Sequence, residues 1–314
     1  MDYFGAVQGP VLIFGGPYSN LAATRAMRRR AEELAIPPQR VVCSGDVVAY
    51  CAEPVETVRL VRDWGIAVVR GNCEEALGSA AAGCGCGFEA GTTCAALATD
   101  WYHFANRRIA AADREWMRRL PGSVRFEQAG RSVRIVHGGV RQINRFIFPS
   151  TAEAVKREEL DRAGTDLLVG GHCGIPWGQK IDRRAWLNAG VIGMPANDGT
   201  ADGWYLLLTP VEGIIRCSWH RLHYAAVAAG RAMHEAGLTG YAEALTTGLW
   251  PSMDVLPAAE RARRGVPIVL NALDFDGRRS GWATPNSTPA IARTARTPRA
   301  GSTISTGNWN WPEI

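Results

Sequence analysis

The stretch VVCSGDVVAYCAEPVETVRLVRDWGIAVVRGN, residues 41–72, decides the fold of this chain. It opens with an apolar run, 41–43, that ends in a Gly-Asp pair, as a buried strand running into a loop does. A helical stretch follows over 54–64, and a second apolar run over 66–69 ends in Gly-Asn. This repetition of strand, glycine-marked loop and helix predicts an α/β protein with polar groups at the carboxyl ends of its strands.

The same pattern occurs closer to the N-terminus. Residues 11–14, VLIF, predict a buried strand that ends in Gly-Gly-Pro. Asn20 is expected to cap a helix that runs from Leu21 to about Ala35, where a Pro-Pro pair follows. The first strand therefore also delivers a glycine-rich loop to the amino end of a helix.

Beyond about residue 122 the chain becomes rich in strands. Strands are predicted at 123–128, 132–136, 166–170, 178–182, 185–188, 204–208 and 213–219. Helices are predicted at 92–104, 111–119, 151–163, 223–236 and 240–248. Strands with helices before, between and after them favour a layered sandwich of two sheets covered by helices.

The overall composition is that of an ordinary globular protein, with 46% hydrophobic and 21% charged residues in 314. No apolar run approaches the ~18 residues that a membrane helix needs. The first ten residues lack the basic and apolar regions of a secretory signal. We therefore expect a cytoplasmic protein without a membrane partner.

The net charge of +5 comes almost entirely from arginine, because Lys156 and Lys180 are the only lysines in the sequence. Apart from a run at 28–30 the arginines are scattered, and no nucleic-acid-binding motif is present. The charge pattern therefore argues against a nucleic-acid partner.

The C-terminal residues differ from the rest of the chain. Residues 280–314 are rich in Arg, Ser, Thr and Pro and poor in acids, a composition that predicts disorder. Trp309 and Trp311 form either a docking tip or part of a dispensable extension. We expect a main domain over 1–250, a C-terminal extension over 251–279, and this tail.

Five short segments carry the polar groups expected at the strand ends. They are GGPYSNL (15–21), GDVVAY (45–50), GNCEE (71–75), HGG (137–139) and GHCG (171–174). Each follows an apolar run, so their side chains should lie on loops along one rim of the sheets. Any one of them occurs by chance in many proteins, whereas their order, placement and spacing make the set specific.

With these segments the chain resembles the calcineurin-like metallophosphoesterases, especially their small bacterial phosphodiesterase-type branch. The similarity runs from about Val11 to Pro210 and includes WLNAGVIGMP at 186–195. The resemblance implies an α/β fold in four layers, αββα, in which a two-sheet sandwich is flanked by helices. It also implies a dinuclear metal centre at the loop ends.

The chain departs from the family's motifs at the ligands of one metal and keeps the ligands of the other. Where the family has Asp-x-His, this chain has Gly16-Pro17-Tyr18, and the second His of Gly-His-x-His is Gly174. The resemblance implies that these positions serve the first metal alone. The bridging aspartate and the ligands of the second metal are kept, as Asp46, Asn72, His137 and His172.

The retained set suits one divalent transition metal ion. Two imidazoles, a carboxylate and an amide oxygen are ligands for Zn, Mn or Fe, and they leave positions open for water or phosphate. Such an ion lowers the pKa of a bound water to ~7 and polarises a phosphoryl oxygen. Taken singly, Asp46 is also typical of a turn, Asn72 of a helix cap, and the two histidines of buried core positions.

Other residues of the five segments are candidates for the chemistry. Tyr18 is a candidate ligand as a phenolate, or a donor to phosphate. Cys73 replaces a family histidine that assists the transition state or leaving group, and is a candidate nucleophile or thiolate ligand. Glu74 or Glu75 is a candidate general acid or base. Phosphate is expected at the amides of a loop beside a helix N-terminus, at Gly16, Tyr18, Ser19 and Asn20.

The eight cysteines are unusually clustered. In a cytosolic chain such a cluster favours metal binding, redox chemistry or buried thiols over disulfides. One hypothesis is a second metal or an iron–sulfur cluster, although the spacing is standard for neither, and buried apolar thiols are the alternative. The candidate cluster ligands are Cys73, Cys84, Cys86 and Cys94, together with Cys173.

The sequence therefore predicts a metal-dependent phosphatase or phosphodiesterase that hydrolyses a small phosphorylated substrate through a metal-activated water. Two alternatives remain at this point. One is a family member that binds a metal or phosphorylated ligand without hydrolysis, as a sensor or an assembly subunit. The other is a cysteine-based metal or redox protein on the same scaffold. A homo-oligomer is compatible with each of them.

Overall fold

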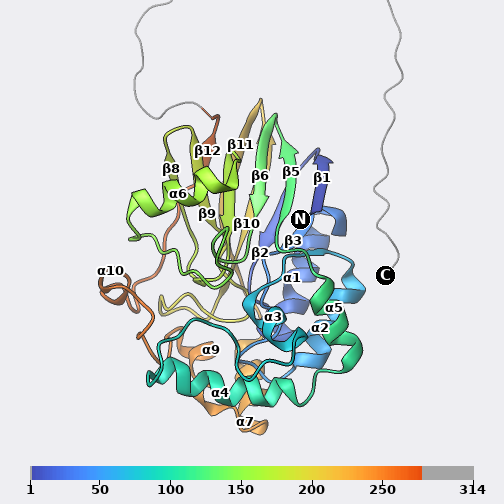
Figure 1. Cartoon of the computed structure of the whole chain (residues 1–314), viewed down its shortest axis with the longest axis vertical. Helices are drawn as coiled ribbons and strands as arrows, with labels where there is room; N and C mark the ends of the chain where they lie inside the picture. The colour runs from blue at the N-terminus through green and yellow to red at the C-terminus, as the bar shows by residue number, and fades with distance from the viewer. Residues whose placement is uncertain (1, 278–314) are drawn as a thin grey trace, which may run out of the picture. The chain divides into compact units, whose positions relative to one another are not determined.

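The computed structural model describes residues 2–277, in which strands and helices alternate along much of the chain (Figure 1). Two six-stranded sheets face one another, and helices cover their outer faces. The predicted four-layer αββα sandwich is confirmed. The tail predicted over 280–314, with Trp309 and Trp311, lies outside the described residues.

The first sheet has the strand order β12-β11-β10-β2-β3-β4. Strands β2, β3 and β4 are parallel, whereas β10, β11 and β12 pair antiparallel. The strands are β2 (Val11–Phe14), β3 (Val41–Cys43), β4 (Ala67–Val68), β10 (Gly203–Val211), β11 (Ile214–Leu222) and β12 (Leu273–Phe275).

The second sheet has the order β1-β5-β6-β7-β9-β8. Strands β6, β7 and β9 are parallel, and antiparallel pairs β5–β6 and β8–β9 flank them. The strands are β1 (Asp2–Ala6), β5 (Val124–Gln128), β6 (Arg131–Ile135), β7 (Leu167–Gly170), β8 (Trp177–Ile181) and β9 (Arg184–Asn188).

Side-chain alternation along the strands builds the layers. In β2, Val11 and Ile13 enter the core between the sheets, whereas Leu12 and Phe14 point to the layer of α1 and α2. Helix α6 covers the outer face of the second sheet, where Leu160 packs with Leu168 and Trp186. Each sheet is therefore buried on both faces, which explains its continuous apolar runs.

Helices α4, α7 and α9 lie together below the strands in Figure 1. The helices are α1 (Leu21–Glu33), α2 (Pro54–Trp64), α3 (Asn72–Gly78), α4 (Thr93–Asn106), α5 (Ala111–Arg119), α6 (Glu153–Ala163), α7 (Ala226–Glu235), α8 (Thr239–Ala242), α9 (Ala244–Thr247) and α10 (Ala258–Arg261), with a 3₁₀ turn at Pro38–Arg40. Within residues 2–277, none of these helices is long and apolar enough to cross a membrane.

The differences from the sequence prediction are short elements. The strands β1 and β12 were not predicted because each is an edge strand whose conformation depends on pairing with one neighbour, β5 or β11. Helix α3 begins inside the GNCEE loop segment. The helix predicted over 240–248 is divided into α8 and α9.

Residues 251–277, expected as a C-terminal extension, pack against the main domain. Strand β12 completes the first sheet, and Phe275 is buried between the two sheets. Leu256 is buried with the residues beneath α6, and the Glu260 carboxylate accepts hydrogen bonds from Ser150. The segment therefore contributes to the core of the described unit.

Candidate metal centre

Four predicted ligands come from four different strand ends. Asp46 follows β3, and Asn72 is the first residue of α3, after β4. His137 follows β6 and His172 follows β7 in the second sheet. Because these strands bring their carboxyl ends to one rim of the sandwich, residues 126 positions apart in the chain (172 − 46) lie side by side.

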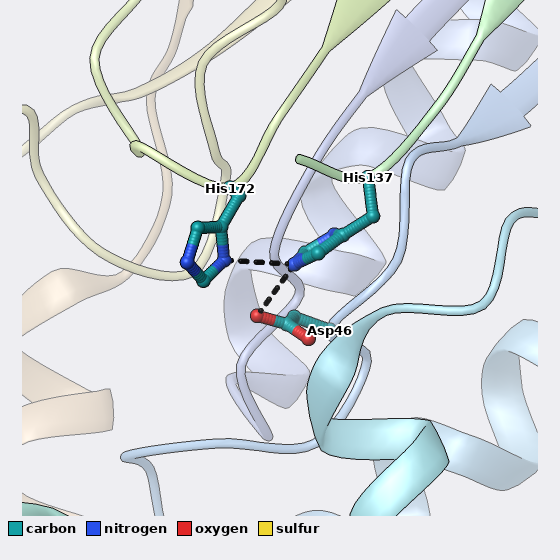
Figure 2. A group of neighbouring side chains, drawn as sticks. All are labelled: Asp46, His137 and His172. Carbon is teal, nitrogen blue, oxygen red and sulfur yellow. Dashed lines mark hydrogen bonds and ion pairs between the residues drawn. The ribbon is translucent and has the colours of Figure 1, made fainter. Parts of the chain in front are cut away.

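Figure 2 shows Asp46, His137 and His172 converging on one point. His137 Nε2 lies 2.9 Å from His172 Nδ1 and 3.3 Å from Asp46 Oδ2. Asn72 Oδ1 lies 3.0 Å from the same nitrogen. The candidate ligand atoms of Asp46 and the two histidines all lie within 4.8 Å of one another, and all three residues are buried.

Neighbouring groups fix the orientation of these side chains. His137 Nδ1 lies 2.8 Å from the carbonyl oxygen of Ser44, which can only accept, so Nδ1 carries the hydrogen and the neutral ring presents a lone pair at Nε2. Asn72 Nδ2 donates to the carbonyl oxygen of Cys84 at 3.1 Å, which turns Oδ1 towards the histidines. Side-chain atoms of the kind that ligate metals therefore converge on one point, and the group could hold a cation.

The side chains of Asp46, His137 and His172 alter one another's pKa. Burial disfavours the charged form of Asp46, but His137 outweighs burial and lowers the pKa of this carboxyl below its usual value. Burial likewise lowers the pKa of His137, but the charge of Asp46 raises it by more, so the pKa of this ring lies above its usual value. Burial and His137 together lower the pKa of His172 to about 3, so this ring is neutral and available as a ligand.

Glu74 holds the loop that presents Asp46. Its carboxylate accepts hydrogen bonds from the amides of Asp46 and Val47, both at 2.8 Å, and of Gly71 at 2.9 Å. Burial, reinforced by the charge of Asp46, raises the pKa of Glu74 to about 7. Asp46 itself has a φ of 57°, a conformation that needs such support in a residue other than glycine. These contacts make Glu74 a positioning residue.

Cys73 contributes to the site through its backbone. Its amide donates to Asp46 Oδ1 at 3.1 Å, which fixes the second oxygen of that carboxylate. Burial, with the charges of Asp46 and Glu74, raises the pKa of the Cys73 thiol well above its usual value. The thiol is therefore protonated at neutral pH and is a poor nucleophile in this state.

The loop predicted to bind phosphate uses its amides internally. Those of Gly16, Tyr18 and Ser19 donate to the carbonyl oxygens of residues 45–47, and that of Asn20 donates to Pro17. Ser19 and Asn20 are completely buried. The Asn20 side chain accepts from the amide of Ala23, which confirms its role as helix cap. These four amides are therefore not available to an anion, which corrects the expectation of a phosphate site there.

Tyr18 lies over Gly16, two residues before it. A Cβ built on Gly16 would lie 2.5 Å from Tyr18 Cζ, so the ring fills the space into which a side chain at position 16 would project. Burial, followed by the charge of Asp46, raises the pKa of Tyr18 well above its usual value. The hydroxyl is therefore protonated at neutral pH, which argues against the phenolate ligand considered above.

Gly174 is covered in the same way by Trp250. A Cβ on Gly174 would lie 3.6 Å from Trp250 Cζ2, which is van der Waals contact, so a larger side chain there would meet the indole. The indole is held by a hydrogen bond from its Nε1 to the carbonyl oxygen of Pro195, at 2.6 Å. Aromatic rings thus cover two of the positions where the resemblance places lost ligands of the first metal.

A cavity of about 60 Å³ opens beside the candidate metal centre. It reaches the centre through Asp46 and His172. The other described lining residues are mainly aromatic or apolar: Tyr18, Tyr50, Cys86, Phe88, Cys94, Phe146, Cys173, Gly174, Val191, Met194, Tyr241, Trp250, Ser252 and Val255. The part of this wall formed by Phe88, Phe146, Tyr241 and Trp250 was not predicted from the sequence, because these residues come from segments that carry no local motif.

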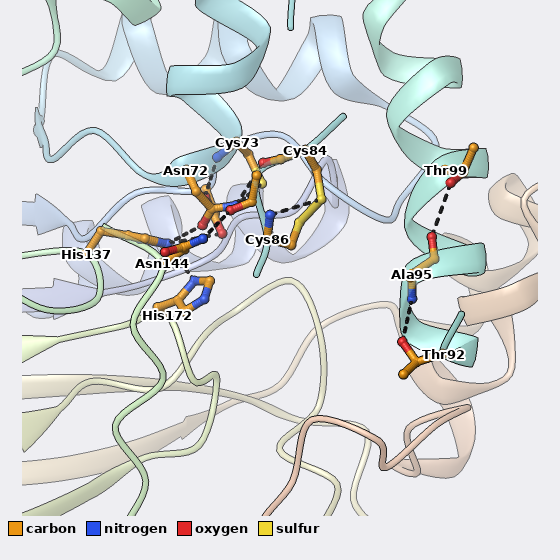
Figure 3. Close-up of a disulfide and its surroundings, with 12 residues drawn as sticks. Asn72, Cys73, Cys84, Cys86, Thr92, Ala95, Thr99, His137, Asn144 and His172 are labelled. Carbon is orange, nitrogen blue, oxygen red and sulfur yellow. Dashed lines mark hydrogen bonds and ion pairs between the residues drawn. A yellow bond between two sulfur atoms is a disulfide. The ribbon is translucent and has the colours of Figure 1, made fainter. Parts of the chain in front are cut away.

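The cysteines do not form a cluster site. Cys84 and Cys86 are joined by a disulfide (Figure 3), so the expectation of free thiols is wrong for this pair. Cys73 and Cys94 are free and buried. In the part of the chain that the structure describes, no cysteine belongs to a group of three or more metal-ligating side chains. The disulfide loop instead adjoins the metal centre, through the Cys84 carbonyl that accepts from Asn72.

The fold and these side chains define an α/β sandwich with a candidate metal centre on its rim. Residues 19–212, more than half of the chain, match the calcineurin-like phosphoesterase superfamily domain. The chain therefore belongs to the calcineurin-like phosphoesterase superfamily, which confirms the family expected from its motifs. A comparison with curated proteins gives no match.

Solved structures share the fold. A metallophosphoesterase from Sphaerobacter thermophilus superposes with a TM-score of 0.58 at 23% sequence identity, covering 77% of this chain and 100% of that one. A hypothetical protein from Pyrococcus horikoshii OT3 gives a TM-score of 0.63 at 13% identity, covering 77% of this chain and 99% of that one. At these identities the likeness concerns the fold.

Proposed function

We propose that this protein hydrolyses a phosphate ester at a single divalent transition metal ion. Asp46, Asn72, His137 and His172 would hold the ion, which is Zn, Mn or Fe. The observation that supports this proposal is the convergence of four electron-pair donors on one buried point, with distances of 2.9 to 3.3 Å from His137 Nε2 to the other three. Such an ion lowers the pKa of water and polarises a phosphoryl oxygen.

Neighbouring residues of the chain hold the proposed ligands in position. The Ser44 carbonyl fixes the tautomer of His137, and Glu74 fixes the strained loop that carries Asp46. We assign the protonated Tyr18 hydroxyl, on the wall of the cavity, as a hydrogen-bond donor to the phosphoryl group. Glu75, which is about half exposed and pairs with Arg70 at 3.9 Å, takes no part in this proposal.

The test is metal content and turnover in His137→Ala and His172→Ala variants. Elemental analysis should give one transition metal ion per wild-type chain and much less in either variant. Hydrolysis of p-nitrophenyl phosphate and bis(p-nitrophenyl) phosphate should fall at least about a hundredfold, more than is lost when only an outer partner of a ligand is changed. His223→Ala is the matched control, because His223 is exposed and pairs with Asp202 away from the site.

Two results would contradict the proposal. Full activity in His137→Ala would remove the metal centre from the chemistry, and two ions per wild-type chain would show that the site is dinuclear. The second candidate function, binding without hydrolysis, is favoured by the rings that cover Gly16 and Gly174. Binding of metal and phosphorylated ligand without any product would establish that alternative.

A further inference from the structure

Two aromatic side chains form the part of the cavity wall that lies beside the candidate metal centre. Tyr18 and Trp250 cover Gly16 and Gly174, the positions where the resemblance places two lost ligands. Both rings also line the cavity that reaches Asp46 and His172. Two rings thus lie against these two positions, and the cavity beside the candidate ligands is enclosed mainly by apolar surface.

The wall extends beyond these two rings. The Tyr18 and Tyr50 rings meet edge to face, with centroids 4.7 Å apart, and the Tyr241 ring lies 4.6 Å from Tyr50. On the other side Phe146 packs against His172, with centroids 4.3 Å apart. Rings from distant parts of the chain therefore surround one cavity, an arrangement that favours a flat apolar or aromatic group.

The charge of the cavity is low. Among the described residues that line it there is no arginine or lysine, and Asp46 is the one carboxylate. A divalent ion held by this single carboxylate leaves one net positive charge for a ligand. A phosphoryl group with one negative charge matches that balance, whereas a second negative charge would be buried without a partner.

We propose that the first-metal position has become an aromatic subsite, and that the ligand is a small phosphodiester with one negative charge and one aromatic or apolar ester group. The ring of that group lies against the surface that Tyr18, Tyr50, Tyr241 and Trp250 present to the cavity, and its phosphoryl group faces Asp46 and His172. A cavity of about 150 Å³ holds a whole benzene ring, so this cavity of about 60 Å³ takes in only part of one such ring and has no room for an extended ligand. The inference rests on the proposed function, because it takes the metal centre as the anchor of the phosphoryl group.

The test is binding of three compounds that cannot be hydrolysed, measured by calorimetry with the metal-loaded protein. Methyl(phenyl)phosphinate has one charge and one ring. Phenylphosphonate keeps the ring but has two charges at alkaline pH, and dimethylphosphinate keeps one charge but has no ring. We expect methyl(phenyl)phosphinate to bind at least about tenfold more tightly than either of the others. Equal or tighter binding of phenylphosphonate would overturn the charge assignment, and equal binding of dimethylphosphinate would overturn the subsite.

Variants of the wall locate the effect. Tyr241→Leu and, independently, Phe88→Leu keep apolar bulk but remove a ring, and should weaken methyl(phenyl)phosphinate binding by about two- to tenfold while leaving dimethylphosphinate unchanged. Tyr3→Leu is the matched control, because Tyr3 is 60% exposed on β1 and does not line the cavity. Unchanged selectivity in both wall variants, each folded by its thermal unfolding, would overturn the subsite.

The outcomes also separate this inference from the proposed function. Hydrolysis of phosphate esters by a protein that binds none of the three compounds selectively would refute the subsite and retain the enzyme. Selective binding of methyl(phenyl)phosphinate with no hydrolysis of any ester would retain the subsite and refute the enzyme.

Discussion

At the scale of single residues, the site depends as much on small side chains as on ligands. Two features favour glycine at position 16, a φ of +44° and the Tyr18 ring, which a Cβ at this position would meet at 2.5 Å. A larger side chain introduced at position 16 would therefore collide with the Tyr18 ring.

Replacing Gly16 with alanine should be more costly than the same change at Gly65, which ends α2 with a φ of +70° and has no neighbour within 4 Å of a Cβ. Gly65→Ala should lower the free energy of unfolding by about 1–2 kcal/mol, the cost of the left-handed conformation. Gly16→Ala should cost about 1–3 kcal/mol more because of the clash with the ring. Urea unfolding of the metal-free protein measures both.

The clash is isolated by a double-mutant cycle with Tyr18→Ala. In that background the cost of Gly16→Ala should fall to the value found at Gly65, since the ring is gone and the backbone strain remains. An unchanged cost in the Tyr18→Ala background would show that the ring does not restrict position 16.

Residue identities also show what sequence could predict of the site. Asp46, Asn72, His137 and His172 each follow an apolar run within their own segment, so local sequence predicted their common rim, whereas their role as ligands was implied by the family resemblance. Tyr241 and Trp250 have no such signal, because they reach the cavity from the loops and short helices beyond β11. The hydrogen bonds from the amides of the 16–19 loop to the carbonyl oxygens of residues 45–47 are likewise tertiary contacts, which local sequence does not predict.

At the scale of elements, long apolar strands and helices were predicted well, and edge strands were not. Helix α2 has its predicted bounds, and β2 and β3 do as well. By contrast β12 is three residues that become a strand by pairing with β11. The segment before β12 is held by a buried polar group. Asp198 accepts from Arg221 at 2.8 Å and from the amide of Ile268 at 3.1 Å.

The Asp198 carboxyl should make the free energy of unfolding depend on pH in the acid range. Burial raises the pKa of Asp198, but hydrogen bonds from Ile268, Thr200 and Arg221 outweigh burial and lower it overall. A carboxyl whose pKa is lowered on folding stabilises the protein above the unfolded pKa, about 3.9, and this stabilisation is lost as pH falls through the folded value. Wild-type stability should therefore drop below about pH 4.

Asp198→Asn should lower the free energy of unfolding at pH 7 by about 2–3 kcal/mol and make the acid dependence shallower than in the wild type. Urea unfolding at pH 7 and pH 3 measures both effects. Asp274→Asn is the control, because it changes an exposed pair with Arg216 and should not alter either result measurably. An Asp198→Asn protein with the wild-type difference between the two pH values would contradict this assignment.

At the scale of the whole molecule, composition indicated where the chain changes character but not where its core ends. The expected boundary at residue 250 has buried side chains beyond it, Leu256 and Phe275. Other apolar residues of the same stretch, Val266 and Val269, are exposed, so apolar character alone does not indicate which of these residues belong to the core. The layers, by contrast, followed from the alternation of apolar runs and helices. The fold was therefore more predictable than its limits.

Truncation tests these limits. A chain ending at residue 250 loses two buried apolar side chains and strand β12, and should be destabilised by at least about 5 kcal/mol, comparable to the total stability of many domains. A chain ending at residue 279 keeps every contact among residues 2–277 and should unfold within a few degrees of the full-length protein. Thermal unfolding followed by circular dichroism measures both. Equal unfolding temperatures for the two truncations would show that residues 251–277 are not part of the core.

The disulfide beside the metal centre has a consequence for how the protein responds to its surroundings. Cys84 and Cys86 are two positions apart, so their bond closes a very short loop and contributes about 1–2 kcal/mol by loop entropy, the low end for disulfides. Breaking it would leave most of the fold's stability in place. The Cys84 carbonyl, however, holds the amide of Asn72. At the proposed metal centre, a reducing environment would therefore change the hold on one proposed ligand, Asn72, while the melting temperature stayed nearly constant.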